Sequence, residues 1–170
     1  GGVAGGASTA ARARRLSEEA EIIMFERGDY ISFANCGLPY HIGGEIPDRS
    51  RLLVQTPESL TKRFRIDVRI KTEIVRIDRE TKQVFARIRD TGKEYVERYD
   101  ALVLSPGADP VRPPLPGMDA KGVFTLRTMN DMDAIIETIE GKDIGRAVVV
   151  GGGYIGLEVT EALRHKGLDV

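Results

Sequence analysis

Two glycine-rich turns, separated by about 150 residues, constrain this chain more than any other feature. Residues 1–6 read Gly-Gly-Val-Ala-Gly-Gly, and residues 151–156 read Gly-Gly-Gly-Tyr-Ile-Gly. Residues that favour a helix follow each turn. Because glycine has no Cβ, the backbone N–H groups at such a helix start can closely approach a pyrophosphate. The pair of turns therefore predicts two dinucleotide sites and electron transfer between two dinucleotides.

The second turn matches the whole G-x-G-x-x-G pattern. Its glycines are Gly151, Gly153 and Gly156. Residues 146–150, Arg-Ala-Val-Val-Val, predict a short buried parallel strand before the turn. Residues 154–166 predict the helix after it, and Gly167 is suited to end that helix. This context favours a nucleotide site over the alternative, an ordinary glycine-rich turn.

The first turn is less regular, because Val3 stands where the middle glycine of the pattern would lie. Gly1 and Gly6 fit the pattern. Glu26 follows twenty residues beyond Gly6, at the end of residues 21–26, Glu-Ile-Ile-Met-Phe-Glu. A strand that ends there would present the carboxylate to a ribose hydroxyl. A surface glutamate is the alternative.

The order of these signals predicts an α/β fold that is truncated at both ends. Two nucleotide-binding units need about 100 residues or more each, and no strand precedes the first turn. We predict one incomplete Rossmann-like domain over 1–110, a connecting segment over 111–145, and the start of a second domain over 146–170.

The middle of the chain predicts a crossover meander. Three strands are expected, at residues 68–78, 83–89 and 95–104. The last one should return to the first sheet. A stiff, proline-rich link follows at residues 110–116. Thr128 is suited to cap a helix over 129–140, with Asp131 three residues on.

Composition excludes several classes of protein. The net charge is -1 with 30% charged residues, which leaves no basic surplus for nucleic acid. No run of about 18 apolar residues is present to span a membrane. The single cysteine, Cys36, excludes an internal disulfide framework and favours a reducing, cytoplasmic compartment. His41 and His165 lack metal-ligand spacing, so no metal is expected.

Two local patterns could carry chemistry. Ser8, Arg12 and Arg15 follow the i, i+4, i+7 spacing of one helix face, which could hold phosphates or could be a solvated basic face. Cys36 lies ten residues past Glu26. If the first dinucleotide is FAD, a nearby thiolate could accept electrons from the reduced ring. A buried, inert cysteine is the alternative.

Several segments resemble the CoA-disulfide reductases. They are residues 1–8, 25–28, 32–40, 104–108 and 151–158, and the segment around Cys36 is the most specific. These enzymes form the single-cysteine branch of the pyridine nucleotide-disulfide oxidoreductases, together with NADH oxidases and NADH peroxidases.

The resemblance implies an FAD domain followed by an NAD(P) domain. NAD(P)H would reduce FAD, and the flavin would reduce a mixed disulfide between Cys36 and coenzyme A. Without a second nearby cysteine, the partner sulfur must come from the substrate, or the thiol must cycle through sulfenic acid as in the oxidases. A persulfide or polysulfide reductase is a further alternative. A homodimer is expected of the full-length protein, and residues 1–170 alone are expected to retain FAD weakly or not at all.

The resemblance also implies roles for individual residues. Those at FAD would be Gly1, Gly6, Glu26, Arg27, Ser105, Pro106 and Gly107. Those at coenzyme A would be Ser8, Arg12, Arg15, Ser32 and Asn35. Those at the nicotinamide nucleotide would be Gly151, Gly153, Tyr154, Ile155, Gly156 and Glu158, with a core tyrosine as the alternative for Tyr154.

Overall fold

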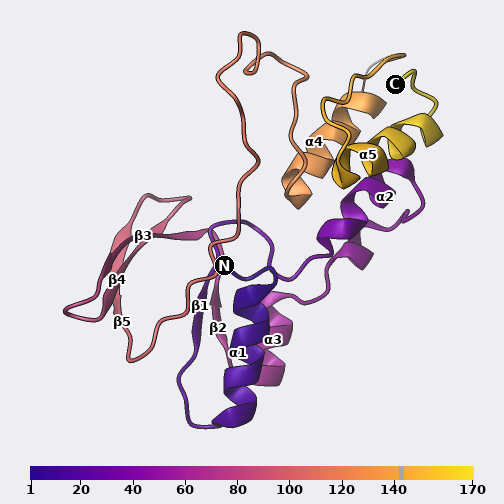
Figure 1. The fold of residues 1–170 in the computed structure, drawn as a ribbon. Helices are drawn as coiled ribbons and strands as arrows, with labels where there is room; N and C mark the ends of the chain where they lie inside the picture. Colours follow the sequence, from indigo (N-terminus) through magenta and orange to yellow (C-terminus); the bar gives the residue numbers. More distant parts are fainter. Residues whose placement is uncertain (142–143) are drawn as a thin grey trace. The chain divides into compact units, whose positions relative to one another are not determined.

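The computed structural model describes residues 1–141 and 144–170, and the chain divides into two compact units (Figure 1). The first unit comprises Gly1–Phe33 and Leu53–Gly107, and the second comprises Ala34–Leu52 and Ala108–Val170. By its contacts, the segment that carries Cys36 thus belongs with the C-terminal part of the chain. The division into nucleotide domains at 1–110, 111–145 and 146–170 stays a prediction.

The first unit contains a small parallel sheet with two helices packed on it. Its elements are α1 (Gly5–Leu16), β1 (Ile23–Phe25), α3 (Pro57–Phe64) and β2 (Asp67–Arg69). The two strands pair in parallel, with Ile23 opposite Asp67. Their core is one cluster of buried apolar residues: Ala10, Met24, Ile31, Leu60 and Ile66. The predicted helix after the first turn and the predicted strand before Glu26 are both confirmed.

Arg14 fixes α1 to the end of α3. Its guanidinium donates to the carbonyls of Phe64 at 2.7 Å and Arg65 at 3.0 Å. It also donates to the carbonyls of Ser17 at 3.1 Å and Glu18 at 2.7 Å. Because the last carbonyls of a helix lack partners within the helix, this arginine satisfies groups that would otherwise need water.

The meander is a three-stranded antiparallel sheet in the order β3-β4-β5. Its strands are β3 (Thr72–Asp78), β4 (Gln83–Ile88) and β5 (Glu94–Arg98). The predicted strand over 68–78 is divided into β2 and β3, because the chain turns at Lys71, where φ is +51°. The predicted strand over 95–104 ends at Arg98. Residues 101–104 are exposed and form no strand, so their predicted return to the first sheet was wrong for the described chain.

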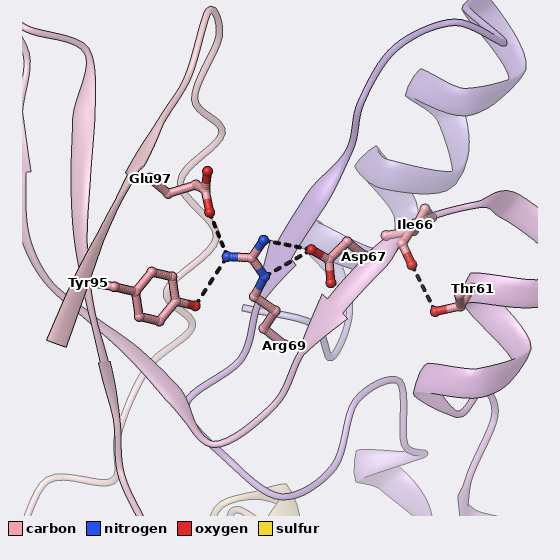
Figure 2. Close-up of polar contacts among 6 residues, drawn as sticks. All are labelled: Thr61, Ile66, Asp67, Arg69, Tyr95 and Glu97. Atoms are coloured by element: carbon pink, nitrogen blue, oxygen red, sulfur yellow. Dashed lines mark hydrogen bonds and ion pairs between the residues drawn. The ribbon is translucent and has the colours of Figure 1, made fainter. Parts of the chain in front are cut away.

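Arg69 joins the parallel sheet to the meander (Figure 2). Its guanidinium contacts Asp67 at 2.7 Å, Glu97 at 2.6 Å and the Tyr95 hydroxyl at 3.2 Å. These hydrogen bonds outweigh burial and raise the pKa of Arg69. On the other side of the sheet, the Thr61 hydroxyl donates to the Ile66 carbonyl at 2.9 Å, which fixes the exit from α3. Strand β2 is therefore fixed both at its start, next to Ile66, and at its end, by Arg69.

The second unit is built from helices. They are the 3-10 helices η1 (Asn35–Gly37) and η2 (Arg49–Leu52) and the α-helices α2 (Leu38–Gly43), α4 (Met129–Glu140) and α5 (Tyr154–His165). Helix α2 packs against both α4 and α5. Arg49 pairs with Asp133 at 2.6 Å, and Glu45 pairs with His165 at 2.7 Å. Both predicted helices are confirmed, and Thr128 caps α4 with Asp131 as predicted.

The predicted strand over 146–150 is represented by one parallel bridge, between Arg146 and Asp169. Val148 and Val150 are 81% and 95% exposed, so the prediction of a buried strand was wrong for the described chain. A buried parallel strand needs neighbours along its edges and helices on both faces, and the described residues leave Val148 and Val150 uncovered. Among residues 1–141 and 144–170, the helices are too short or too polar to cross a bilayer.

Candidate functional site

The first glycine turn closes against itself and against a distant segment. A Cβ on Gly6 would overlap the carbonyl oxygen of Gly1, and a Cβ on Gly1 would overlap that of Ser105. The turn therefore needs glycine at both positions, and it brings together Gly1, Gly6 and Ser105, three of the residues that the resemblance assigns to FAD. Pro106 and Gly107, the next two residues, are exposed, and Gly107 has a φ of +71°.

Glu26 lies at the end of β1 and is only 9% exposed. Its two carboxylate oxygens accept the N–H groups of Gly2 and Gly28, each at 2.7 Å. The surface-glutamate alternative is therefore wrong. Arg27 beside it is exposed, and its carbonyl accepts a hydrogen bond from Arg89 at 3.2 Å. A turn without Cβ atoms beside a strand-end carboxylate fits a dinucleotide, although a ribose contact stays a prediction.

A groove of about 440 Å³ runs between α1 and α3. The polar residues that line it are Ser8, Arg12 and Arg15 of α1, Ser32, Gln55, and Arg63 of α3. The structure thus brings together four of the five residues predicted to hold coenzyme A. The fifth, Asn35, is exposed in the second unit.

Ser32 is held in an unusual backbone conformation at one end of this groove. Its φ is +43°, a region that non-glycine residues seldom adopt. Its N–H donates to the Gly2 carbonyl at 3.0 Å, and its carbonyl accepts the N–H groups of Val54 at 2.8 Å and Gln55 at 3.2 Å. Strained residues that the surrounding structure fixes cluster at functional sites, which is consistent with the predicted role of Ser32.

Sequence reasoning missed Gln55 and Arg63 in the groove. Gln55 lies just before α3 and Arg63 lies in its last turn, and this helix was not predicted. The signal was Thr56 followed by Pro57 and Ser59, a cap with proline in the first turn, and the structure shows this capping box.

Cys36 lies in η1, immediately before α2, and its free thiol is exposed. Leu38 and Ile42 are buried and anchor the helix behind it. The N–H of Ala34 donates to the carbonyl of Leu52 at 2.8 Å, which closes the loop at its base. The alternative of a buried cysteine is therefore wrong for the described chain, because η1 leaves the thiol exposed to solvent.

The second glycine turn has the backbone expected of its pattern. Gly151 has a φ of +114°, and a Cβ on Gly156 would overlap the carbonyl oxygen of Gly151. Gly153 caps α5. Tyr154 is 89% exposed, so the core-tyrosine alternative is wrong. The remaining residues predicted for the nicotinamide nucleotide also lie on the first turns of α5, where Ile155 is exposed and Glu158 is half-buried.

No group of three or more histidine, cysteine, aspartate or glutamate side chains that could hold a metal occurs among the residues described. The two glycine turns, the helices they open and the parallel strand before Glu26 define an α/β protein of the dinucleotide-binding class. The model of the family "pyridine nucleotide-disulphide oxidoreductase" matches residues 1–170. The chain belongs to this family.

Within this family, the chain is similar to several individual proteins. The chain is 43% identical over 170 residues to a coenzyme A disulfide reductase of Staphylococcus epidermidis, and the match covers 100% of this chain and 38% of that relative. It therefore spans well under half of the curated relative's length. It is also 55% identical to reduced Bacillus anthracis CoADR-RHD, with a TM-score of 0.97 over 99% of this chain and 30% of that chain.

Two further solved structures are similar at lower identity. A NAD-dependent persulfide reductase from A. fulgidus is 38% identical, with a TM-score of 0.94 over 99% of this chain and 31% of that one. A water-forming NADH oxidase from Lactobacillus brevis is 31% identical, with a TM-score of 0.90 over 99% of this chain and 37% of that one. The same fold thus occurs in proteins named for three different substrates.

Proposed function

We propose that the full-length protein is a flavoprotein oxidoreductase that transfers electrons from NAD(P)H through FAD and Cys36 to CoA disulfide. The observation that carries this proposal is the groove between α1 and α3, where Ser8, Arg12, Arg15 and Ser32 meet. Guanidinium groups bind phosphates well, and coenzyme A carries several. The 43% identity to the reductase of S. epidermidis supports the same choice of substrate.

Two sets of residues would hold the cofactors. Gly1, Gly6, Glu26, Arg27 and the turn over 105–107 would hold FAD. The glycines of the second turn would hold the pyrophosphate of NAD(P)H, with Tyr154, Ile155 and Glu158 near the nicotinamide. When bound, FAD supplies the means by which the two electrons of NAD(P)H reach a disulfide bond.

The role of Cys36 follows from its exposed thiol. Its thiolate attacks one sulfur of CoA disulfide, which forms a Cys36–CoA disulfide and releases the other CoA as a thiolate that takes up a proton. Two electrons then cleave the mixed disulfide, release the second CoA and restore the thiolate. In total, one NAD(P)H and one proton convert one CoA disulfide to two CoA thiols. Asn35 lies beside the reacting sulfur in sequence and would orient the substrate.

The setting proposed for this chemistry is a reducing, cytoplasmic compartment and a homodimer of the full-length protein. The free, exposed Cys36 supports the compartment, because such a thiol persists where disulfides are rare. The dimer rests on the family resemblance and is checked by light scattering of the full-length protein.

The test is the reduction of CoA disulfide by the full-length protein and its Cys36→Ser variant. We expect wild type to consume NAD(P)H with CoA disulfide and the variant to lose this activity by at least about a thousandfold, since serine cannot form the mixed disulfide. The control is NAD(P)H-dependent reduction of a dye, which needs the flavin only and should survive in the variant.

Intact mass before and after dithiothreitol separates the alternatives. A CoA adduct on Cys36 that dithiothreitol removes supports the reductase. A sulfenic acid on Cys36 with rapid oxygen consumption indicates an NADH oxidase instead. Preferred turnover of a CoA persulfide indicates the persulfide reductase.

A further inference from the structure

Arg63 occupies a position in the groove that no predicted role accounts for. It lies in the last turn of α3 and lines the groove opposite Arg12 and Arg15 of α1, the helix beside α3 (Figure 1). Its guanidinium lies 5.2 Å from the centroid of the Phe64 ring, which favours one orientation of the side chain. Because Arg14 binds the carbonyls of Phe64 and Arg65, the end of α3 is fixed relative to α1.

The three arginines that line the groove lack counter-charges. Among the residues that the structure describes, Arg12, Arg15 and Arg63 make no ion pair, and no carboxylate lines the groove. Arg69, by contrast, contacts two carboxylates. A groove that is lined by three cations and by no carboxylate among the described residues attracts a ligand with several negative charges.

We propose that Arg63 is a specificity-determining residue that binds a phosphate group of the substrate. This inference rests on the proposed function and adds to it a third cation from a second helix. Three guanidinium groups match a ligand with more than one phosphate group, such as the nucleotide end of coenzyme A. Arg63 thereby selects a phosphorylated disulfide over one with the same reacting sulfurs and no phosphate. The oxygen substrate of an oxidase would give these charges no partner.

The experiment compares two disulfides in the full-length protein. CoA disulfide carries phosphates, and pantethine is the corresponding disulfide without them. For Arg63→Ala, we expect kcat/KM for CoA disulfide to fall about tenfold, mainly through KM, with pantethine unchanged. Arg63→Lys should recover part of the loss, because lysine keeps the charge without the planar fork. High salt should reduce the difference.

A matched control and a binding measurement complete the test. Lys62→Ala removes an exposed charge from the same turn of α3 that does not line the groove, so it should leave both disulfides unaffected. Adenosine 3′,5′-bisphosphate, titrated calorimetrically, should bind Arg63→Ala about tenfold more weakly than wild type. Thermal unfolding checks that each variant is folded, as expected for an exposed side chain without hydrogen bonds.

The outcomes separate this inference from the proposed function. If wild type reduces CoA disulfide and Arg63→Ala behaves like Lys62→Ala, the role of Arg63 is overturned while the proposed function stands. An equal loss on CoA disulfide and pantethine also overturns it, because that pattern indicates a structural role. If wild type reduces neither disulfide, the proposed function fails, and unchanged binding of the bisphosphate by Arg63→Ala then rejects Arg63 as well.

Discussion

The two glycine-rich turns share one backbone design. In the first, Gly6 lies so close to the carbonyl oxygen of Gly1 that a Cβ would overlap it. In the second, Gly156 has the same relation to Gly151. Each turn leads directly into a helix of 12 residues. This close approach of a helix to the turn before it is what the last glycine of such a pattern permits.

The surroundings of the two turns differ. The first is enclosed, because the Gly2 N–H donates to Glu26 at 2.7 Å and the carbonyl of Ser105 lies against Gly1. Around residues 151–153, an added Cβ would meet nothing within 4 Å among the described residues. A glycine pattern therefore defines a local turn, while enclosure depends on segments that are distant in sequence.

Substituting the last glycine of each turn should weaken the binding of a different nucleotide in each case. In the full-length protein, Gly6→Ala should weaken FAD binding about a hundredfold, since the overlap with Gly1 costs about 3 kcal/mol unless the turn shifts. Gly156→Ala should instead raise KM for NAD(P)H and leave the flavin bound. Flavin absorbance after dialysis and steady-state kinetics measure these effects.

The comparison of the turns fails if Gly156→Ala also releases the flavin, or if Gly6→Ala retains it fully. Gly92→Ala is not a suitable control, because Gly92 has a φ of +70° and would be strained itself. Gly145→Ala is suitable, since its φ is not positive and a Cβ there would meet nothing within 4 Å.

Removing the charge of Glu26 should test the enclosure of the first turn. Glu26→Gln leaves one acceptor oxygen where two backbone N–H groups need partners, which should cost about 2 kcal/mol of stability. It should also weaken FAD binding. Urea unfolding and flavin titration measure the two effects, with the exposed Glu21→Gln as control. Equal stability of the two variants would show that the carboxylate does not hold the turn.

The ion pairs of the two regions should also differ in their contribution to stability, with the larger contribution in the region of the first turn. The Arg69 side chain is 27% exposed and contacts two carboxylates, whereas that of Arg146 is 78% exposed and, among the residues that the structure describes, pairs with one, Asp169. Arg69→Ala should lower the free energy of unfolding by about 1 kcal/mol, and Arg146→Ala by less than about 0.5 kcal/mol. Chemical denaturation of the two variants measures the difference, and a larger effect at Arg146 would reverse the comparison.

The smallest expected effect is a loss of stability at low pH, caused by protonation of Asp78 in the meander. Backbone N–H groups, chiefly that of Thr81 at 3.0 Å, hold the pKa of Asp78 below its ordinary value. A lowered pKa in the folded state stabilises the protein above the unfolded pKa, and this contribution is lost as pH falls through the folded value. The melting temperatures of wild type and Asp78→Asn should therefore converge below about pH 4. A constant difference would exclude this role for Asp78.

Local patterns predicted the helices well. The Thr128-capped α4 and the helix after the second glycine turn were predicted within a residue, and a helix was also expected after the first turn. Periodicity also placed Ser8, Arg12 and Arg15 on one face, and all three line the groove. These features depend on residues within a few positions of one another, which is why the sequence suffices for them.

Features that depend on distant partners were predicted less well. Residues 101–104 and 146–150 have the composition of strands, yet β-structure needs a neighbouring backbone. Within the described chain, these two segments form a single bridge, between Arg146 and Asp169. The charge of Arg63 was visible in the sequence, but its position opposite α1 was not.

The sequence by itself determined the two glycine turns, the helices they open, the single thiol of Cys36 and the family resemblance. Only the tertiary structure decided that Cys36 is exposed, that Glu26 is buried against the first turn, and that α3 contributes Arg63 to the groove. The reason is physical: backbone conformation is set by neighbours along the chain, whereas burial and convergence of charge are set by segments that meet in space.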